Sequence, residues 1–350
     1  MGNCKVFFVV FAFLCVLVSH EVAANDSTAR IGAGGLELVK SNSIRMAEET
    51  LEVSQKQIRV RYKFVNDASS DLTTLVAFPM PRFGWNPGEA QLDANVGPMN
   101  SFETRVDGQL VKTKTETKAY VNQKDITGRL KAHGYTDGDI VSTLSCRIDS
   151  MAECMPDSLN KLVPGIKKDG APSYQAQQTA WWEQKFPSGK TVEIEHVYKP
   201  KVGYVYGTYT GHESEREFIS PWAPGGNTGA EDGHAACTHE GSETAVRARI
   251  RRLAALGDGE VWVTLNDIEY VLGTGRNWRG PIGKFVLRIE KAFPEQIASL
   301  CFPGKVRQVN NRTLEFEANN FTPPDSLIVY LFTVKTGGQI DREPAVKGNR

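Results

Sequence analysis

The chain has 350 residues with 41 basic and 41 acidic side chains, so its formal net charge at pH 7 is zero. A neutral chain without a long basic run is not expected to hold nucleic acid or an anionic membrane surface by charge. Hydrophobic residues make up 40% and charged residues 23% of the sequence, a composition typical of folded proteins that excludes wholesale disorder.

The first 24 residues have the pattern of an export signal. Lys5 provides a positive start, an uninterrupted apolar run extends from Val6 to Val18, and small residues follow at Ala23 and Ala24. The apolar run is shorter than the roughly 20 residues that a membrane-spanning helix needs, and no later segment is apolar enough to span. We therefore predict cleavage after Ala24, a periplasmic or secreted location, and no transmembrane segment after signal removal.

Removal of this segment would leave 350 − 24 = 326 residues and four cysteines: Cys146, Cys154, Cys237 and Cys301. An even number of cysteines in an oxidising compartment predicts two disulfides, for which three connectivities are open. The short spacing favours a bond between Cys146 and Cys154, which leaves Cys237 to pair with Cys301.

Two segments alternate between apolar and polar residues, as half-buried strands do. The outward positions are basic in the first, Ile58–Phe64, and acidic in the second, Val192–Tyr198. If the two strands are neighbours, a facing pair such as Arg61 and Glu193 is worth at most about 1 kcal/mol. His196 falls on the apolar side of the second strand, where a hydrogen-bonded core histidine is expected.

The stretch from about 120 to 186 is expected to be a helical insertion. Asp125 and Thr136 can act as N-caps of two short helices, and Tyr174–Gln184 is interpreted as a third helix that carries Trp182. Between them, Lys161–Ser173 is rich in Lys, Gly and Pro and is predicted to be a loop.

The second half of the chain is expected to open with a loop and to end in strands. Gly203–Gly241 is rich in glycine and proline, so it is predicted to be a long functional or mobile loop. Ala245–Leu256 is predicted to be an amphipathic helix whose four arginines form a solvated face more commonly than a site for an anionic partner. Apolar alternation predicts the remaining strands at Leu72–Phe78, Val261–Leu265, Ile268–Leu272, Phe285–Ile289, Leu314–Phe316 and Leu327–Val334.

These elements predict a mainly β fold. We expect an antiparallel β-sandwich with the helical insertion and long loops, in which residues 25–336 form one β-rich domain and residues 337–350 a flexible tail.

His234, Cys237, His239 and Glu240 form the densest group of metal-ligating residue types. The group is a weak metal candidate, because zinc sites usually combine two pairs of ligands and Cys237 is better used in a disulfide. The second histidine of the metalloprotease helix is missing, and there is no Gly-x-Ser-x-Gly elbow. The sequence therefore predicts no catalytic residue, no metal and no cofactor.

Trp182 and Trp278 are the aromatic residues of greatest interest. Trp278 stands in a turn bracketed by Gly275 and Gly280, between two predicted strands. As buried residues the two tryptophans would anchor loops against the sandwich, and as exposed residues they would be binding anchors. The first interpretation is favoured.

Eight stretches share a pattern that extends over nearly the whole chain after the signal: Asn25–Ala29, Gly34–Leu36, Ile58–Tyr62, Thr73–Pro81, Trp182–Gly189, His196–Pro200, Thr274–Gly283 and Ser299–Cys301. In combination they resemble the Domain of Unknown Function 4424 family of bacterial exported proteins. The resemblance implies a β-rich body and a bacterial periplasmic or secreted location, and it supplies no catalytic residues. Cys146 and Cys154 are not part of the family pattern, so their pairing rests on spacing alone.

The sequence favours a non-catalytic envelope protein that binds another envelope protein or a small ligand, with no role for nucleic acid. One alternative is a metal-dependent hydrolase that uses the 203–241 loop, with His234 and His239 as its chemistry. The other is a structural component of a surface assembly. An enzyme remains the less favoured interpretation.

Overall fold

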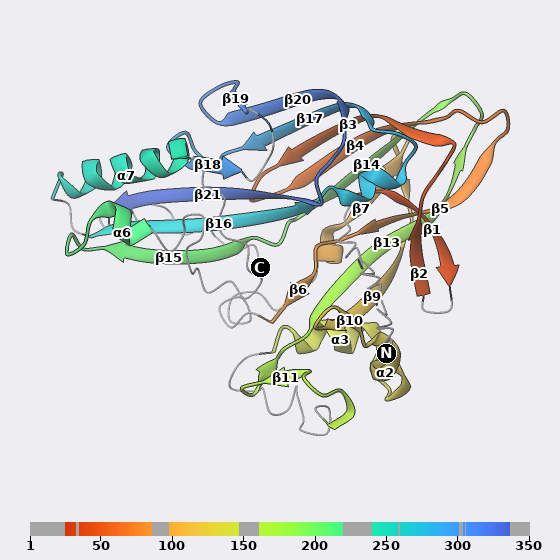
Figure 1. Ribbon diagram of the computed structural model, residues 1–350, viewed down its shortest axis with the longest axis horizontal. Coiled ribbons are helices and arrows are strands. Elements are labelled where there is room, and N and C mark those ends of the chain that lie inside the picture. The colour runs from red at the N-terminus through yellow and green to blue at the C-terminus, as the bar shows by residue number, and fades with distance from the viewer. Residues whose placement is uncertain are drawn as a thin grey trace, which may run out of the picture.

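The structure, a computed structural model, describes residues 25–32, 35–85, 98–146, 161–219, 240–257, 260–300, 304 and 306–336. Within these residues the fold is mainly β, with antiparallel sheets and a few helices (Figure 1). This confirms the predicted fold class. No helix in the described residues is long and apolar enough to cross a membrane.

The largest described sheet carries the two charged strands that the alternation predicted. Its order is β19 (Arg307–Gln308), β20 (Thr313–Phe321), β17 (Ile282–Glu290), β3 (Ile44–Val53), β4 (Ile58–Asn66), β14 (Thr191–Tyr198), β7 (Glu103–Val106) and β8 (Gln109–Val111). β4 and β14 are antiparallel neighbours, which confirms the hypothesis that they pair, whereas β3 and β17 pair in parallel. Arg61 faces Glu195 and not Glu193, and the ion pair that forms is the diagonal one between Glu195 and Arg59, at 3.1 Å.

A second sheet packs against this one through its central strands. Its order is β10 (Lys124–Asp125), β9 (Lys114–Val121), β13 (Gln175–Phe186), β5 (Leu72–Pro79), β1 (Ser27–Gly32) and β2 (Gly35–Val39), with β6 (Phe83–Gly84) paired to β13. β1 follows directly on Asn25 and Asp26, so the described chain enters the fold at the interface between sheets.

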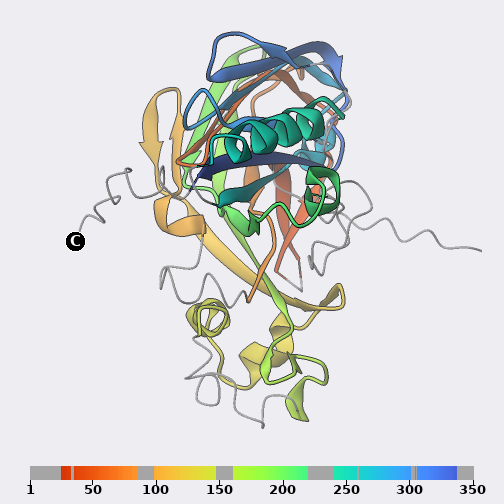
Figure 2. The ribbon, with the colours of Figure 1, turned by 90° about the vertical axis from the view of Figure 1, so that its left-hand side faces the viewer.

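The third sheet has one face covered by a helix. Its order is β15 (Gly203–Tyr209), β16 (Val261–Val271), β21 (Ser326–Thr336) and β18 (Ile297–Leu300). Helix α7 (Glu240–Ala254) lies across β21 (Figure 2) and buries Val246, Ile250 and Leu253 against the sheet, beside the short helix α6 (Glu215–Ile219). The predicted amphipathic helix is thus confirmed, and Gly257 follows its end in a left-handed conformation.

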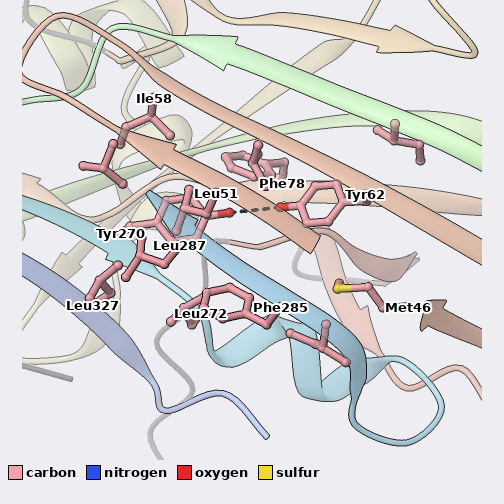
Figure 3. Close-up of a cluster of buried hydrophobic side chains, with 14 of the residues drawn as sticks. Met46, Leu51, Ile58, Tyr62, Phe78, Tyr270, Leu272, Phe285, Leu287 and Leu327 are labelled. Carbon is pink, nitrogen blue, oxygen red and sulfur yellow. Dashed lines mark hydrogen bonds between the residues drawn. The ribbon is translucent and has the colours of Figure 1, made fainter. Parts of the chain in front are cut away.

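All three sheets contribute to one hydrophobic core. Tyr62 and Leu51 enter it from the largest sheet, Phe78 from the second and Tyr270 from the third (Figure 3). Tyr62 and Tyr270 approach each other at its centre through their hydroxyl groups, 3.0 Å apart.

The predicted insertion is only partly helical. The N-cap of helix α2 (Thr127–Ala132) is Ile126 and not the predicted Asp125, although Asp125 accepts a 2.8 Å hydrogen bond from the Thr127 amide. Helix α3 (Asp137–Thr143) begins, as predicted, at Thr136, which forms a capping box with Asp139. Inside the predicted Lys161–Ser173 loop, β11 (Lys167–Lys168) and β12 (Ala171–Pro172) form a small hairpin.

The prediction of a helix at Tyr174–Gln184 is wrong. This segment belongs to β13, which pairs with β5 on one side and β9 on the other. In its second half Ala180, Trp182 and Phe186 are buried and Gln184 between them is half-buried, whereas Glu183 and Lys185 are exposed, which is a period of two. Glutamine and alanine suggested a helix by propensity, and pairing in the middle of a sheet overrides that preference.

The predicted loop Gly203–Gly241 is also partly wrong. Its first residues form the edge strand β15, because Val205 and Tyr209 pack toward α6 and α7 while the strand pairs with β16 over seven positions. Residues 220–239 of this segment lie outside the described part of the chain.

Candidate functional site

A buried hydrogen-bonded pair lies under strand β14. His196 is fully buried, with Nε2 3.0 Å from Oδ1 of Asp26 and Nδ1 3.0 Å from the hydroxyl of Thr104. In the neutral imidazole Nε2 donates to the carboxylate and Nδ1 accepts from the hydroxyl. This confirms the prediction that His196 is a hydrogen-bonded core residue.

Aromatic rings enclose this histidine. Phe102 stacks on it with ring centroids 5.0 Å apart, Phe78 lies at 4.7 Å, and Trp182 meets it edge-on at 5.5 Å. An imidazole in such an enclosure is held in one orientation and shielded from water.

Asn25 continues the polar cluster toward the centre of the core. Its side-chain amide donates to both oxygens of Glu49, at 3.2 and 3.4 Å, and its side-chain oxygen accepts from the Tyr62 hydroxyl. Since Tyr62 donates there, Tyr270 can donate to Tyr62. We call these connected residues the buried network: Asn25, Asp26, Glu49, Tyr62, Thr104, His196 and Tyr270.

Burial controls the protonation of this network. Desolvation raises the pKa of Glu49 from 4.5 to about 8, despite the hydrogen bond from Asn25. Desolvation also raises the pKa of Asp26, although His196 opposes the shift, and it raises the pKa values of both tyrosines. Oδ2 of Asp26 is buried and has no hydrogen-bond partner among the described residues. The network is therefore short of positive charge.

Trp278 fixes the entry of the chain into this network. Its indole Nε1 donates to the Asp26 carbonyl at 2.6 Å, and its ring lies 4.3 Å from that of Phe64. The Thr274 hydroxyl donates to the Asn25 carbonyl at 2.5 Å. Trp278 and Trp182 are both buried in the main core, which supports the anchoring interpretation over exposed binding anchors.

The other face of β14 forms the floor of a groove. Glu195 and Val197 point outward there, between Arg59 of β4 and Arg105 of β7. The groove has a volume of about 490 Å³, within the range of small-molecule sites. Because His196 stands between Glu195 and Val197 on the same strand, the buried network holds the floor in place.

The groove carries more positive than negative charge. Its charged residues are Lys56, Arg59, Arg105 and Lys199 against Glu103 and Glu195, which leaves 4 − 2 = +2. Arg59 pairs with Glu195 at 3.1 Å and Arg105 with Glu103 at 3.5 Å, and all four side chains are partly exposed. The backbone amide of Lys199 donates to the Ser101 hydroxyl at 2.8 Å, which fixes this edge of the groove. An anion in the groove would meet guanidinium groups already held in position.

Most of the predicted disulfide and metal residues fall outside the described residues. These are Cys154, Cys237, Cys301, His234 and His239, together with the predicted signal before Asn25. Cys146 is buried beside Trp85, whose indole donates to its carbonyl at 2.8 Å. Glu240 begins α7. No cluster able to hold a metal is found among the described residues.

Asp26, Glu49 and Tyr270 belong to the buried network although no sequence pattern predicted them as site residues. The sequence does contain a sign that Glu49 is buried, because the alternation of inward and outward residues in β3 shifts by one position just before it. A register shift between Met46 and Glu48 turns Glu49 toward the core, in line with Leu51. A carboxylate on the apolar phase of a strand marks a buried polar site. Asp26 meets His196 across 170 positions, which no local pattern reveals.

A family model described as domain of unknown function DUF4424 matches residues 24–330. The chain belongs to this family. No curated protein matches the sequence. Among solved structures, a candidate nutrient binding protein from Legionella pneumophila is similar at 16% identity, with 88% of this chain and 70% of that chain covered and a TM-score of 0.41. At that level the likeness assigns neither a fold nor a ligand to this member of the family.

Proposed function

We propose that this protein is a non-catalytic binding protein of the bacterial envelope that holds a small anionic ligand in the groove over β14. The observation that carries the proposal is the net charge of +2 on a concave floor made by three adjacent strands. Val197 adds an apolar contact between the charged groups. A ligand with one or two carboxylate or phosphate groups and a short carbon skeleton suits this lining.

Replacing Lys56 and Arg105 together by alanine is expected to weaken binding of such a ligand at least tenfold. Hydrogen bonds to charged groups are worth about 1.5–3 kcal/mol each, and both side chains lie on the groove. Titration calorimetry at low salt with inorganic phosphate, citrate and glutamate measures the affinities. Arg30→Ala is the control, since Arg30 is exposed and pairs with Glu37 on another sheet. The proposal would be contradicted if the double variant and the parent bound the anions with equal affinity. It would also be contradicted if the parent bound none of them.

Export forms part of the same proposal. The predicted signal and the family resemblance support a periplasmic or secreted location. We further propose that Cys146 is half of a structural disulfide with one of Cys154, Cys237 and Cys301. The burial of Cys146 and the even number of cysteines after the predicted signal support this assignment. Peptide mapping without reductant would identify the partner, and a free thiol at Cys146 would contradict it.

A second candidate function rests on exposed aromatic rings. Tyr204 and Tyr206 on β15 are 56% and 60% exposed, and Trp262 on β16 continues the row, with ring centroids 5.8 and 6.3 Å apart. The planes of Tyr206 and Trp262 differ by only 18°. We call these three residues the aromatic strip. Flat rings exposed in a row suit a ligand with flat apolar faces, such as a glycan chain.

Tyr206→Ala is expected to lower glycan affinity several-fold to tenfold, because it removes the middle ring of the strip and aromatic contacts are worth about 0.5–1.5 kcal/mol. Affinity electrophoresis through gels that contain soluble polysaccharides measures the effect. Leu110→Ala is the control, since Leu110 on β8 is exposed to a similar degree, 65% against 60% for Tyr206. Unchanged retardation of the variant would contradict a glycan site. Self-association that disappears in the variant would instead favour the structural-assembly function.

A further inference from the structure

The first two residues after the predicted cleavage site lie inside the core. Asn25 and Asp26 are both fully buried. The Asn25 carbonyl accepts from Thr274, and the next carbonyl accepts from Trp278, so the backbone there is fixed by two side chains. The first residue after the predicted cleavage site is thus a fixed part of the buried network, whereas a chain terminus is usually exposed.

Two carboxyl groups beside Asn25 lack a full set of positive partners. Glu49 contacts the neutral amide of Asn25, and no cation among the described residues contacts it. Oδ1 of Asp26 accepts a hydrogen bond from His196, while its Oδ2 is buried without a hydrogen-bond partner. Buried carboxylates are normally paired or hydrogen-bonded on both oxygens, so this arrangement indicates a missing cation.

Cleavage after Ala24 would create such a cation. Water adds across the Ala24–Asn25 amide bond, the carboxylate leaves with the signal segment, and the amine on Asn25 takes up a proton. The side chain of the same residue, Asn25, contacts Glu49. The next residue in the chain, Asp26, carries the unpartnered carboxylate oxygen.

We propose that the α-ammonium group of Asn25, released by signal removal, is the built-in counter-ion of the Asp26 and Glu49 carboxylates. The inference rests on the proposed export and goes beyond it, since it makes processing a step that completes the core. The titratable groups that face this position are Asp26 itself, Glu49 from β3, Tyr62 from β4, His196 from β14 and Tyr270 from β16. With the ammonium present, two basic groups meet two carboxyl groups.

Two purified forms of the otherwise full chain test the pairing. One begins at Asn25, and the other keeps Ala23 and Ala24 before it. The form that begins at Asn25 is expected to unfold at a higher urea concentration at pH 7. Its α-amine is expected to react with an acetylating reagent at least tenfold more slowly than the amine of the extended form, as measured by mass spectrometry of the N-terminal peptide.

Glu49→Gln tests the identity of the partner. In this variant the difference in urea midpoint between the two forms is expected to shrink. Glu48→Gln is the matched control, since Glu48 is the preceding residue of β3, lies on the surface and pairs with Lys63 at 2.9 Å. The control is expected to leave the difference between the forms unchanged.

Equal midpoints together with equally reactive amines would overturn the proposed ion pair. Sequencing the N-terminus of protein recovered from intact cells tests the export proposal separately. A natural N-terminus at another residue would remove the cleavage after Ala24, whereas the comparison of the two purified forms would still decide the pairing. Asn25 as the natural first residue with a slowly reacting amine supports both.

Discussion

Replacement of His196 by alanine is expected to lower the free energy of unfolding by about 3–5 kcal/mol, because it removes a buried hydrogen-bond partner and a buried ring together. The imidazole is fully buried and contacts Asp26 at 3.0 Å. Without it, both oxygens of the Asp26 carboxylate would be unpartnered, because Oδ2 already has no partner among the described residues. The loss of the ring also opens a cavity between Phe78 and Phe102.

Urea unfolding at pH 7 measures this loss. His133→Ala is the control, because His133 is exposed near the end of α2 and is expected to change stability by less than about 0.5 kcal/mol. His196→Gln should recover part of the loss, since its amide can still donate to Asp26. In a double-mutant cycle with Asp26→Asn, the two losses should be clearly non-additive. A loss below about 1 kcal/mol for His196→Ala would mean that the pair is not a stabilising contact.

The strands of the largest sheet could be predicted because one face of each is buried. In β4 and β14 the side chains alternate with a period of two, so the sequence reveals both the strand and the side that faces the core. The same alternation placed His196 in the core. Helix α3 was predictable for a local reason as well, since Thr136 and Asp139 satisfy its first amides.

The remaining features depend on contacts that no local pattern contains. β13 is a strand because β5 and β9 supply hydrogen bonds on both sides, although its glutamines favour a helix. The partner of His196 comes from the first described residues, and the groove combines β4, β7 and β14, which are far apart in sequence. The alternating charges of β4 and β14 could be recognised in the sequence, but the concave shape of the groove could not.

The stability of the form that keeps Ala23 and Ala24 is expected to decrease as the pH rises from about 5 to 8, and Glu49 is the cause. Burial raises the pKa of Glu49 from 4.5 to about 8, so the folded chain holds this proton more tightly than the unfolded chain does. The contribution of the protonated Glu49 carboxyl group to the free energy of unfolding is complete below pH 4.5 and is lost as the pH rises toward 8. In the middle of this window each pH unit is expected to lower the free energy of unfolding by on the order of 1 kcal/mol.

Glu49→Gln is expected to remove this slope, because an amide does not titrate and can still accept from the Asn25 side chain. The measurement is the free energy of urea unfolding of parent and variant at pH 5, 6, 7 and 8, with the difference plotted against pH. Glu48→Gln should give a flat difference, since that side chain is exposed on the same strand. Parallel profiles for parent and Glu49→Gln would show that Glu49 is ionised in the folded chain. In the form that begins at Asn25 the slope should be smaller, because the new ammonium favours the ionised carboxylate.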